Sequence, residues 1–125
     1  MIKQIPSKEI EKYIKKNPKC VLIDVRTQEE WVADGKPDGE KIGLKTYFLT
    51  IQFADKSFNK NFYKDLENLN ISQDNEILTM CMGGVRSQVA AELIIKKNYK
   101  CSNISDGFLG NNENAGWKKS NLPCK

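Results

Sequence analysis

Residues 76–87 read Glu-Ile-Leu-Thr-Met-Cys-Met-Gly-Gly-Val-Arg-Ser and join two kinds of secondary structure. The apolar run that ends at Met80 predicts a buried strand, and residues 88–97 have the apolar spacing of a helix. Cys81 therefore lies at the start of a strand-to-helix loop. Strands that alternate with helices form parallel sheets, and such sheets bind ligands at the carboxyl ends of their strands.

The rest of the chain alternates in the same way. Apolar and β-branched runs predict further strands at residues 2–5, 20–25, 46–53 and 102–105. Four helices are expected between and after these strands. The first is capped by Ser7 and ended by Asn17-Pro18, and the second is opened by Thr27 and Glu30. The third carries Phe58, Phe62, Leu66 and Leu69, and the fourth, at 88–97, buries Val89, Ala90, Leu93 and Ile94. This order predicts a single α/β domain over residues 1–125, with a five-stranded parallel sheet flanked by helices on both faces.

The composition is that of an ordinary globular domain. Of the 125 residues 39% are hydrophobic, and 20 basic against 16 acidic side chains give a net charge of +4. The positive charge is scattered along the chain, so no nucleic-acid partner is expected. No segment has the apolar length of a membrane span or a secretion signal, so we expect a cytoplasmic protein without membrane contact. One small domain is compatible with a monomer.

Four cysteines and no histidine narrow the possible chemistry. Cys20, Cys81, Cys101 and Cys124 form no Cys-x-x-Cys pair, which argues against a zinc site and, in the cytoplasm, against structural disulfides. The lack of histidine excludes Cys-His and Ser-His catalysis, and neither a metal nor a cofactor is expected. Activation of Cys81 must therefore come from backbone dipoles and arginine.

The loop after Cys81 has the features of an anion-binding cradle. Amides that open a helix, together with the helix dipole, favour negative charge in front of them. Gly83 and Gly84 can take positive φ, which lets consecutive N–H groups curl around an anion, and Arg86 adds a permanent positive charge. Surroundings of this kind stabilise a thiolate. The alternative is that Cys81 is a small buried residue that ends a strand.

The loop and several dipeptides outside it match a known family pattern. Cys81, Gly84, Arg86 and Ser87 fit Cys-x-x-Gly-x-Arg-Ser/Thr. The supporting matches are Asp24-Val-Arg26, Glu30-Trp31, Asp106-Gly107, Trp117 and Pro123. On these residues the chain resembles the single-domain rhodanese family of sulfurtransferases over nearly its whole length. The resemblance implies a five-stranded parallel α/β fold and a cysteine that cycles through a persulfide.

The implied reaction is a two-step sulfur transfer with Cys81 and Arg86 as catalytic residues. The thiolate takes the outer sulfur of a small anionic donor, thiosulfate or a persulfide, and a thiol or cyanide removes it. A persulfide on a partner protein is a further class of donor. The expected substrate-binding residues are Met82, Gly83, Gly84, Val85, Ser87 and Asp24. The open alternatives are a structural ion pair for Arg86 and a turn-capping role for Asp24.

Two positions depart from the family, and both concern substrate choice. Met82 stands where a charged residue is frequent, and Gly35-Lys-Pro-Asp38 replaces the usual Gly-His-Ile segment. The nearest enzymatic alternative is a cysteine-dependent phosphatase or arsenate reductase of the same general fold. Phosphatase loops typically place five residues between cysteine and arginine, whereas four separate Cys81 from Arg86. A non-catalytic binding module and a redox-sensing role for Cys81 are further alternatives.

Overall fold

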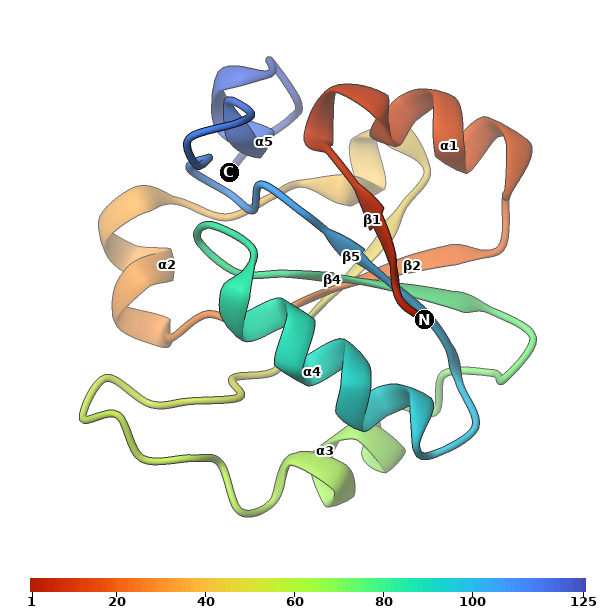
Figure 1. Ribbon diagram of the computed structural model, residues 1–125, viewed down its shortest axis with the longest axis vertical. Coiled ribbons are helices and arrows are strands. Elements are labelled where there is room, and N and C mark those ends of the chain that lie inside the picture. The colour runs from red at the N-terminus through yellow and green to blue at the C-terminus, as the bar shows by residue number, and fades with distance from the viewer.

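The computed structural model describes all 125 residues and contains one open sheet of five parallel strands. In chain order the strands are β1 (Lys3–Ile5), β2 (Cys20–Asp24), β3 (Lys45–Phe48), β4 (Glu76–Met80) and β5 (Lys100–Ile104). Their order across the sheet is β1-β5-β4-β2-β3, which places β4 at the centre (Figure 1). The α/β class and the five-stranded parallel sheet expected from the sequence are confirmed.

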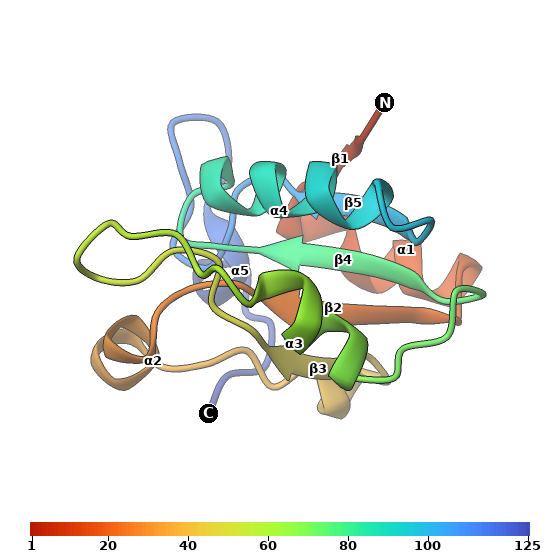
Figure 2. The same ribbon diagram turned by 90° about the horizontal axis from the view of Figure 1, so that it is seen from below.

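Helices cover both faces of this sheet. They are α1 (Ile10–Lys16), α2 (Gln28–Asp34), α3 (Phe62–Asn68), α4 (Val85–Ile95) and α5 (Gly116–Lys119), with the short 3-10 helices η1 (Ser7–Glu9) and η2 (Gly39–Ile42). Helices α3 and α4 pack on one face, and α1 and α5 pack on the other. Figure 2 shows α3 and α4 in front of the sheet with α1 behind it. No helix has the length and apolar composition that crossing a lipid bilayer requires.

Strand β2 shows how the sequence produces these two layers. All five of its residues are buried. Because successive side chains of a strand point to opposite faces, Val21 and Ile23 join the cluster beneath α3 and α4, while Leu22 joins the cluster beneath α1 and α5. Full burial of an aliphatic side chain of this size contributes about 1.5–3 kcal/mol. A strand buried on both faces therefore reads as an unbroken apolar run.

The third strand and the helix after it are shorter than the sequence predicts. Strand β3 ends at Phe48 rather than at residue 53, and residues 51–59 fold back as a hairpin in which Gln52 pairs with Phe58. Phe58 lies in this hairpin with 49% of its surface exposed, so it is not part of α3. Phe58 has helical spacing from Phe62 in the sequence, but α3 begins only at Phe62.

Helix α4 begins at Val85, three residues before the predicted start. Its buried side chains are Ser87, Ala90, Ala91 and Ile94, with the spacing of one helix face. Val89 was predicted to be buried, but it lies beside that face and is 45% exposed. The earlier start also places Arg86 in the first turn of the helix.

Two further local predictions have different outcomes. The capping box of α2 is confirmed, because Thr27 Oγ1 accepts from the Glu30 amide at 3.1 Å and Glu30 Oε1 accepts from the Thr27 amide at 3.0 Å. Ser7 does not cap α1. It lies within η1, and its hydroxyl and amide donate to Asp106 at 2.8 and 2.9 Å.

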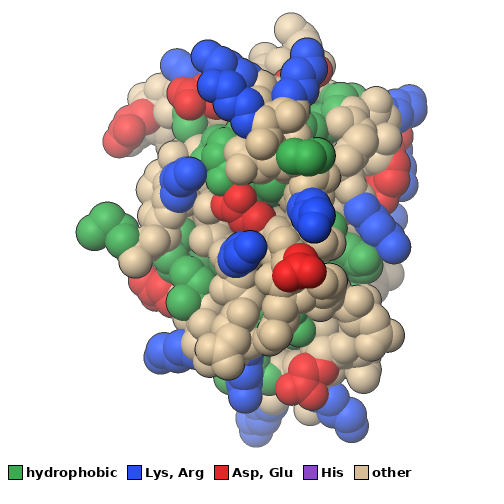
Figure 3. All heavy atoms as spheres, turned by 90° about the vertical axis from the view of Figure 1, so that its right-hand side faces the viewer, with side chains coloured by type: hydrophobic (Ala, Val, Ile, Leu, Met, Phe, Trp, Pro, Cys, Tyr) green, Lys and Arg blue, Asp and Glu red, His purple; other side chains and the backbone are tan.

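The strands run from one side of the molecule to the other, and their carboxyl ends lie on the side of the Cys81 loop. Figure 3 shows the face on the right of Figure 1, where lysine and arginine side chains are spread around a few acidic ones. Strand β4 begins toward this face and runs away from it, so its carboxyl end reaches the other side of the molecule, beside α2 and the first turn of α4 (Figure 1). The loop that carries Cys81 begins there.

Candidate active site

Cys81 follows β4 directly and precedes the first turn of α4 by three residues. Its side chain is 2% exposed and belongs to the apolar cluster beneath α3 and α4. The Sγ atom accepts a hydrogen bond from the Gly84 amide at 3.1 Å and another from Ser87 Oγ at 3.3 Å. Hydrogen bonds donated to sulfur stabilise a negative charge on it. The thiol is thus held where an anion is favoured.

The main chain of the loop is held from outside, and its amides are left free. Five consecutive carbonyl groups each accept a hydrogen bond from a neighbouring segment: Met80 from Val25, Cys81 from Phe108, Met82 from Leu109, Gly83 from Asn111 and Gly84 from Asn103. The amides of Met82, Gly83, Val85 and Arg86 donate to no acceptor in the protein. Unpaired amides next to a nucleophile are suited to binding a developing anion.

Two glycines allow this packing. Gly84 has φ of +109°, and a Cβ at this position would overlap the Ser105 carbonyl group. Gly107 has φ of +63°, and a Cβ there would come within 2.5 Å of the Cys81 carbonyl oxygen. Gly83 was expected to share the positive φ of Gly84 but does not have one. The turn into α4 therefore depends on Gly84 alone.

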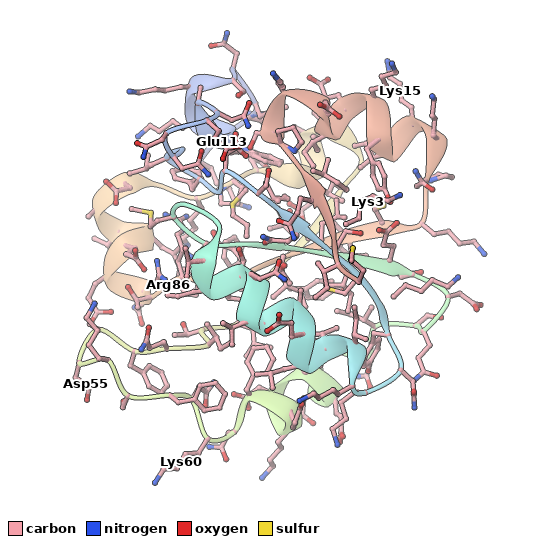
Figure 4. The ribbon with its side chains drawn as sticks, viewed as in Figure 1. Lys3, Lys15, Asp55, Lys60, Arg86 and Glu113 are labelled. Carbon is pink, nitrogen blue, oxygen red and sulfur yellow. The ribbon has the colours of Figure 1, made fainter.

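Arg86 is engaged in an ion pair with Glu30 from α2. Its two terminal nitrogens donate to the two carboxylate oxygens at 2.8 and 2.9 Å, and about a quarter of each side chain is exposed. Figure 4 shows Arg86 where the start of α4 faces α2. Partial burial acts to raise the pKa of Glu30, but the hydrogen bonds and charge of Arg86 and the bonds of Thr27 outweigh it and lower the pKa to about 2. The structural alternative for Arg86 is thus realised.

Asp24 ends β2 beside Met80, and its carboxylate accepts no hydrogen bond from the loop. It is fully buried and accepts hydrogen bonds from the Arg26 amide, Nε and Nη2 at 2.9–3.1 Å. The backbone bond is the turn cap that the sequence left open. Glu29 and Glu30 are close to Arg26 in the sequence and would be available for a local ion pair, but Arg26 pairs with Asp24 instead.

Arg26 contacts both Asp24 and the loop residue Met82. Its guanidinium lies over the Phe108 ring at 4.1 Å and donates to the Gly35 carbonyl at 2.9 Å. Its Nη1 is 3.6 Å from Met82 Sδ. Met82 therefore packs against a buried cation that is already neutralised. Nothing in the local sequence signals these contacts of Phe108 or the Asn103 and Asn111 bonds, because their partners are distant along the chain.

The other cysteines are unsuited to nucleophilic attack. Cys20 and Cys101 are buried at the amino ends of β2 and β5. Burial, reinforced by the charge of Glu76, raises the pKa of each thiol to about 12, so both stay protonated near neutral pH. Burial also raises the pKa of Cys124. No three cysteine or acidic side chains lie close enough together to hold a metal ion.

The fold and the loop define an α/β protein with a cysteine at the carboxyl edge of its central strand. A model of the rhodanese-like domain matches residues 7–113, and the chain belongs to this family. It is 45% identical over 108 residues to the uncharacterized protein RP600 of Rickettsia prowazekii, covering 86% of this chain and 84% of that one.

Two solved structures extend the comparison. Rv0390 of M. tuberculosis is similar over 98% of this chain and 96% of its own, with a TM-score of 0.81 and 28% identity. A protein of Rhodopseudomonas palustris described as a possible tyrosine phosphatase is similar over 99% of this chain and 85% of its own, with a TM-score of 0.63 and 20% identity. At that identity the second likeness concerns the fold alone.

Proposed function

We propose that the protein is a sulfurtransferase that carries a sulfane sulfur on Cys81. The observation that supports this most directly is the thiol itself, which accepts two hydrogen bonds beside four unpaired amides. In a persulfide the negative charge lies one atom beyond Sγ. The unpaired amides of the loop are hydrogen-bond donors that are in place before the reaction begins. Preorganised donors of this kind stabilise charge without having to reorient.

The reaction has two displacement steps. In the first, the Cys81 thiolate attacks the outer sulfur of thiosulfate or of a persulfide. A new S–S bond forms, the donor's S–S bond breaks, and the electron pair leaves with sulfite or with a thiolate. In the second, cyanide or a thiolate attacks the outer sulfur, the Cys81 S–S bond breaks, and the thiolate of Cys81 is restored.

The phosphatase alternative is less well supported by the site. A free cation over the nucleophile would stabilise a bound phosphate dianion, but both terminal nitrogens of Arg86 are taken by Glu30. The loop is also one residue shorter than that of a typical phosphatase, as the sequence indicated. We further propose a cytoplasmic location, since all four cysteines are free and reduced thiols are typical of the cytoplasm. We also propose a monomeric state, with which a single small domain is compatible.

Intact mass and product release test the proposed function together. The reduced protein is incubated with thiosulfate or with a low-molecular-weight persulfide, its mass is measured, and thiocyanate is determined after cyanide is added. We expect one sulfur atom on the wild type and on Cys124→Ser, and none on Cys81→Ser. The proposal is wrong if Cys81 takes up no sulfur, or if an aryl phosphate is hydrolysed at a rate comparable to sulfur transfer.

A further inference from the structure

An apolar groove lies directly beside the Cys81 loop. Its wall is formed by the 51–59 hairpin and the first two turns of α4, and its lining residues are Ile51, Gln52, Phe58, Val85, Arg86 and Val89. The volume is about 240 Å³. Phe58, Val85 and Val89 expose 49%, 79% and 45% of their surface. Three partly uncovered apolar side chains therefore converge on one depression.

The groove is continuous with the site. Val85 and Arg86 are the residues that end the loop and begin α4, so they belong to both. Ile51 is buried and belongs to the same apolar cluster as Cys81. A ligand in the groove would thus lie against the segment whose unpaired amides adjoin the sulfur.

The electrostatics of this region do not favour a small dianion. The depression next to the groove contains two acidic side chains, Glu29 and Glu30, and two basic ones, Lys56 and Arg86, so their formal charges cancel. The charge of Arg86 is already matched by the bidentate pair with Glu30. A mostly apolar wall, in which the one charged side chain is paired, next to a charge-balanced rim is complementary to a ligand with a neutral, apolar body.

We propose that the physiological acceptor is a small thiol with an apolar, ring-sized group that binds in this groove, an inference that rests on the proposed sulfur transfer. A dry apolar cavity of about 150 Å³ can hold benzene, so the groove has room for a ring and a short linker. The acceptor loses its thiol proton to solvent and its thiolate attacks the outer sulfur of the Cys81 persulfide. The new S–S bond forms on the acceptor, and the bond to Cys81 breaks with its electron pair left on Sγ.

The test compares two thiols that differ in their apolar body. Wild-type protein is loaded with sulfur from a low-molecular-weight persulfide and freed of excess donor. Its discharge to 2-phenylethanethiol and to 2-mercaptoethanol is then followed by intact mass. We expect discharge to the phenyl compound to be roughly tenfold faster, as differences of one apolar group in a pocket allow. Phe58→Ala and Val89→Ser should bring this ratio close to one, whereas Val32→Ser, which alters an exposed valine of α2 outside the groove, should keep it.

The outcomes separate the two proposals. If Cys81 accepts sulfur but discharges it equally to both thiols, the groove assignment is overturned and the proposed function stands. If Cys81 accepts no sulfur from any donor, both are overturned. If a small protein with one reduced thiol discharges Cys81 faster than 2-phenylethanethiol, and Phe58→Ala removes that advantage, the groove is a protein-docking surface and the small-thiol assignment is wrong. As a measurement independent of loading, 2-phenylethanol should shift the NMR signals of Val89 and Phe58, and no shift would contradict the inference.

Discussion

Glu30 connects the start of α2 to the active loop through a single carboxylate. Its Oε1 accepts from the Thr27 amide and from Arg86, and its Oε2 accepts from Arg86 alone. The ion pair fixes Arg86 beside the loop and occupies both of its terminal nitrogens. The unpaired backbone amides are therefore the donors left free near Cys81, whereas the sequence predicted that Arg86 would share this role.

The ion pair of Glu30 and Arg86 should make the free energy of unfolding depend on pH. The pKa of Glu30 in the folded protein is about 2, below its ordinary value of 4.5, so the pair stabilises fully above pH 4.5 and is lost as the pH falls toward 2. Allowing for partial exposure, we expect a loss of roughly 1–2 kcal/mol. Urea unfolding at several pH values should show wild type more stable than Glu30→Gln at pH 6, with the difference vanishing near pH 2. A difference that persists at low pH would contradict this account.

Gly84 is the position where the loop tolerates no side chain. Gly84→Ala adds a Cβ that overlaps the Ser105 carbonyl group at a φ of +109°, and should lower the free energy of unfolding by roughly 3 kcal/mol and reduce sulfur loading. Gly43→Ala is the matched control. Gly43 also has positive φ, but its added Cβ would meet nothing within 4 Å, so a loss of about 1 kcal/mol is expected. Equal losses in thermal or urea unfolding would refute the steric explanation.

At the scale of elements, the site depends on how α2 and α4 begin. Helix α2 begins with the Thr27 capping box, which also orients Glu30. Helix α4 begins directly after Gly84, whose amide donates to Cys81. The two helix starts face each other and are joined by the ion pair of Arg86. A substitution that destabilises the first turn of α2 should therefore also change the position of Arg86 in the first turn of α4.

Thr27→Ala tests this connection. Loss of the cap should lower the free energy of unfolding by about 1 kcal/mol, because the Glu30 amide loses its acceptor. It should also slow sulfur loading of Cys81, since the carboxylate that holds Arg86 is less well fixed. Gln28→Ala, at the next residue, which is exposed whereas Thr27 is buried, should change neither quantity. Chemical denaturation measures the free energy of unfolding, and intact mass over time measures the rate of sulfur loading on Cys81. A Thr27→Ala variant with wild-type stability and loading would contradict the proposed connection between the two helix starts.

Elements with a strong local pattern were predictable, and those decided by distant contacts were not. The apolar run of β2 and the capping box of α2 each identify their element from a few adjacent residues. The 51–59 hairpin was not foreseen, because its aromatic residues have the spacing of a helix and the composition of a strand. Its turn is set by local polar bonds such as Ser57 to Asp55, which hydrophobic periodicity does not detect.

In the candidate site, too, features set by adjacent residues were predictable and contacts between distant residues were not. The loop residues could be identified from their types and spacing alone. The pairing of Arg86 with Glu30 could not, since the two are 56 positions apart in the sequence. The location of Asp24 at the strand end was foreseen, but burial and three bonds from Arg26 give it a supporting role that the sequence left undecided.

At the scale of the whole molecule, Asp106 ties the two ends of the chain together. It is buried, and its carboxylate accepts from Ser7 near the amino terminus and from the Gly116 amide near the carboxyl terminus. The next residue, Gly107, packs against the Cys81 loop. The segments that flank the sheet thus meet at one carboxylate beside the site.

Asp106→Ala should be among the most destabilising single changes. It leaves two buried amides without an acceptor and the Ser7 hydroxyl with only a long bond to the Gly107 carbonyl at 3.4 Å, and we expect a loss of roughly 3 kcal/mol in the free energy of unfolding. Ser7→Ala removes only one of these bonds and should lose about 1 kcal/mol. Asp74→Ala, at an exposed turn, is the control and should be nearly neutral. Thermal unfolding would decide, and a neutral Asp106→Ala would show that the ends are held by other contacts.

The outward anchoring of the loop carbonyls has a consequence for how such a protein can change over time. Since the bonds to residues 80–84 involve main-chain oxygens, the loop keeps its shape whichever side chains occupy positions 82 and 85. Val85 is 79% exposed, and Met82 packs against Arg26, but none of the five hydrogen bonds that hold the loop carbonyls involves either side chain. Side chains at these two positions can therefore change while the main chain around Cys81 keeps its shape, which makes them suitable targets for directed evolution of the proposed activity.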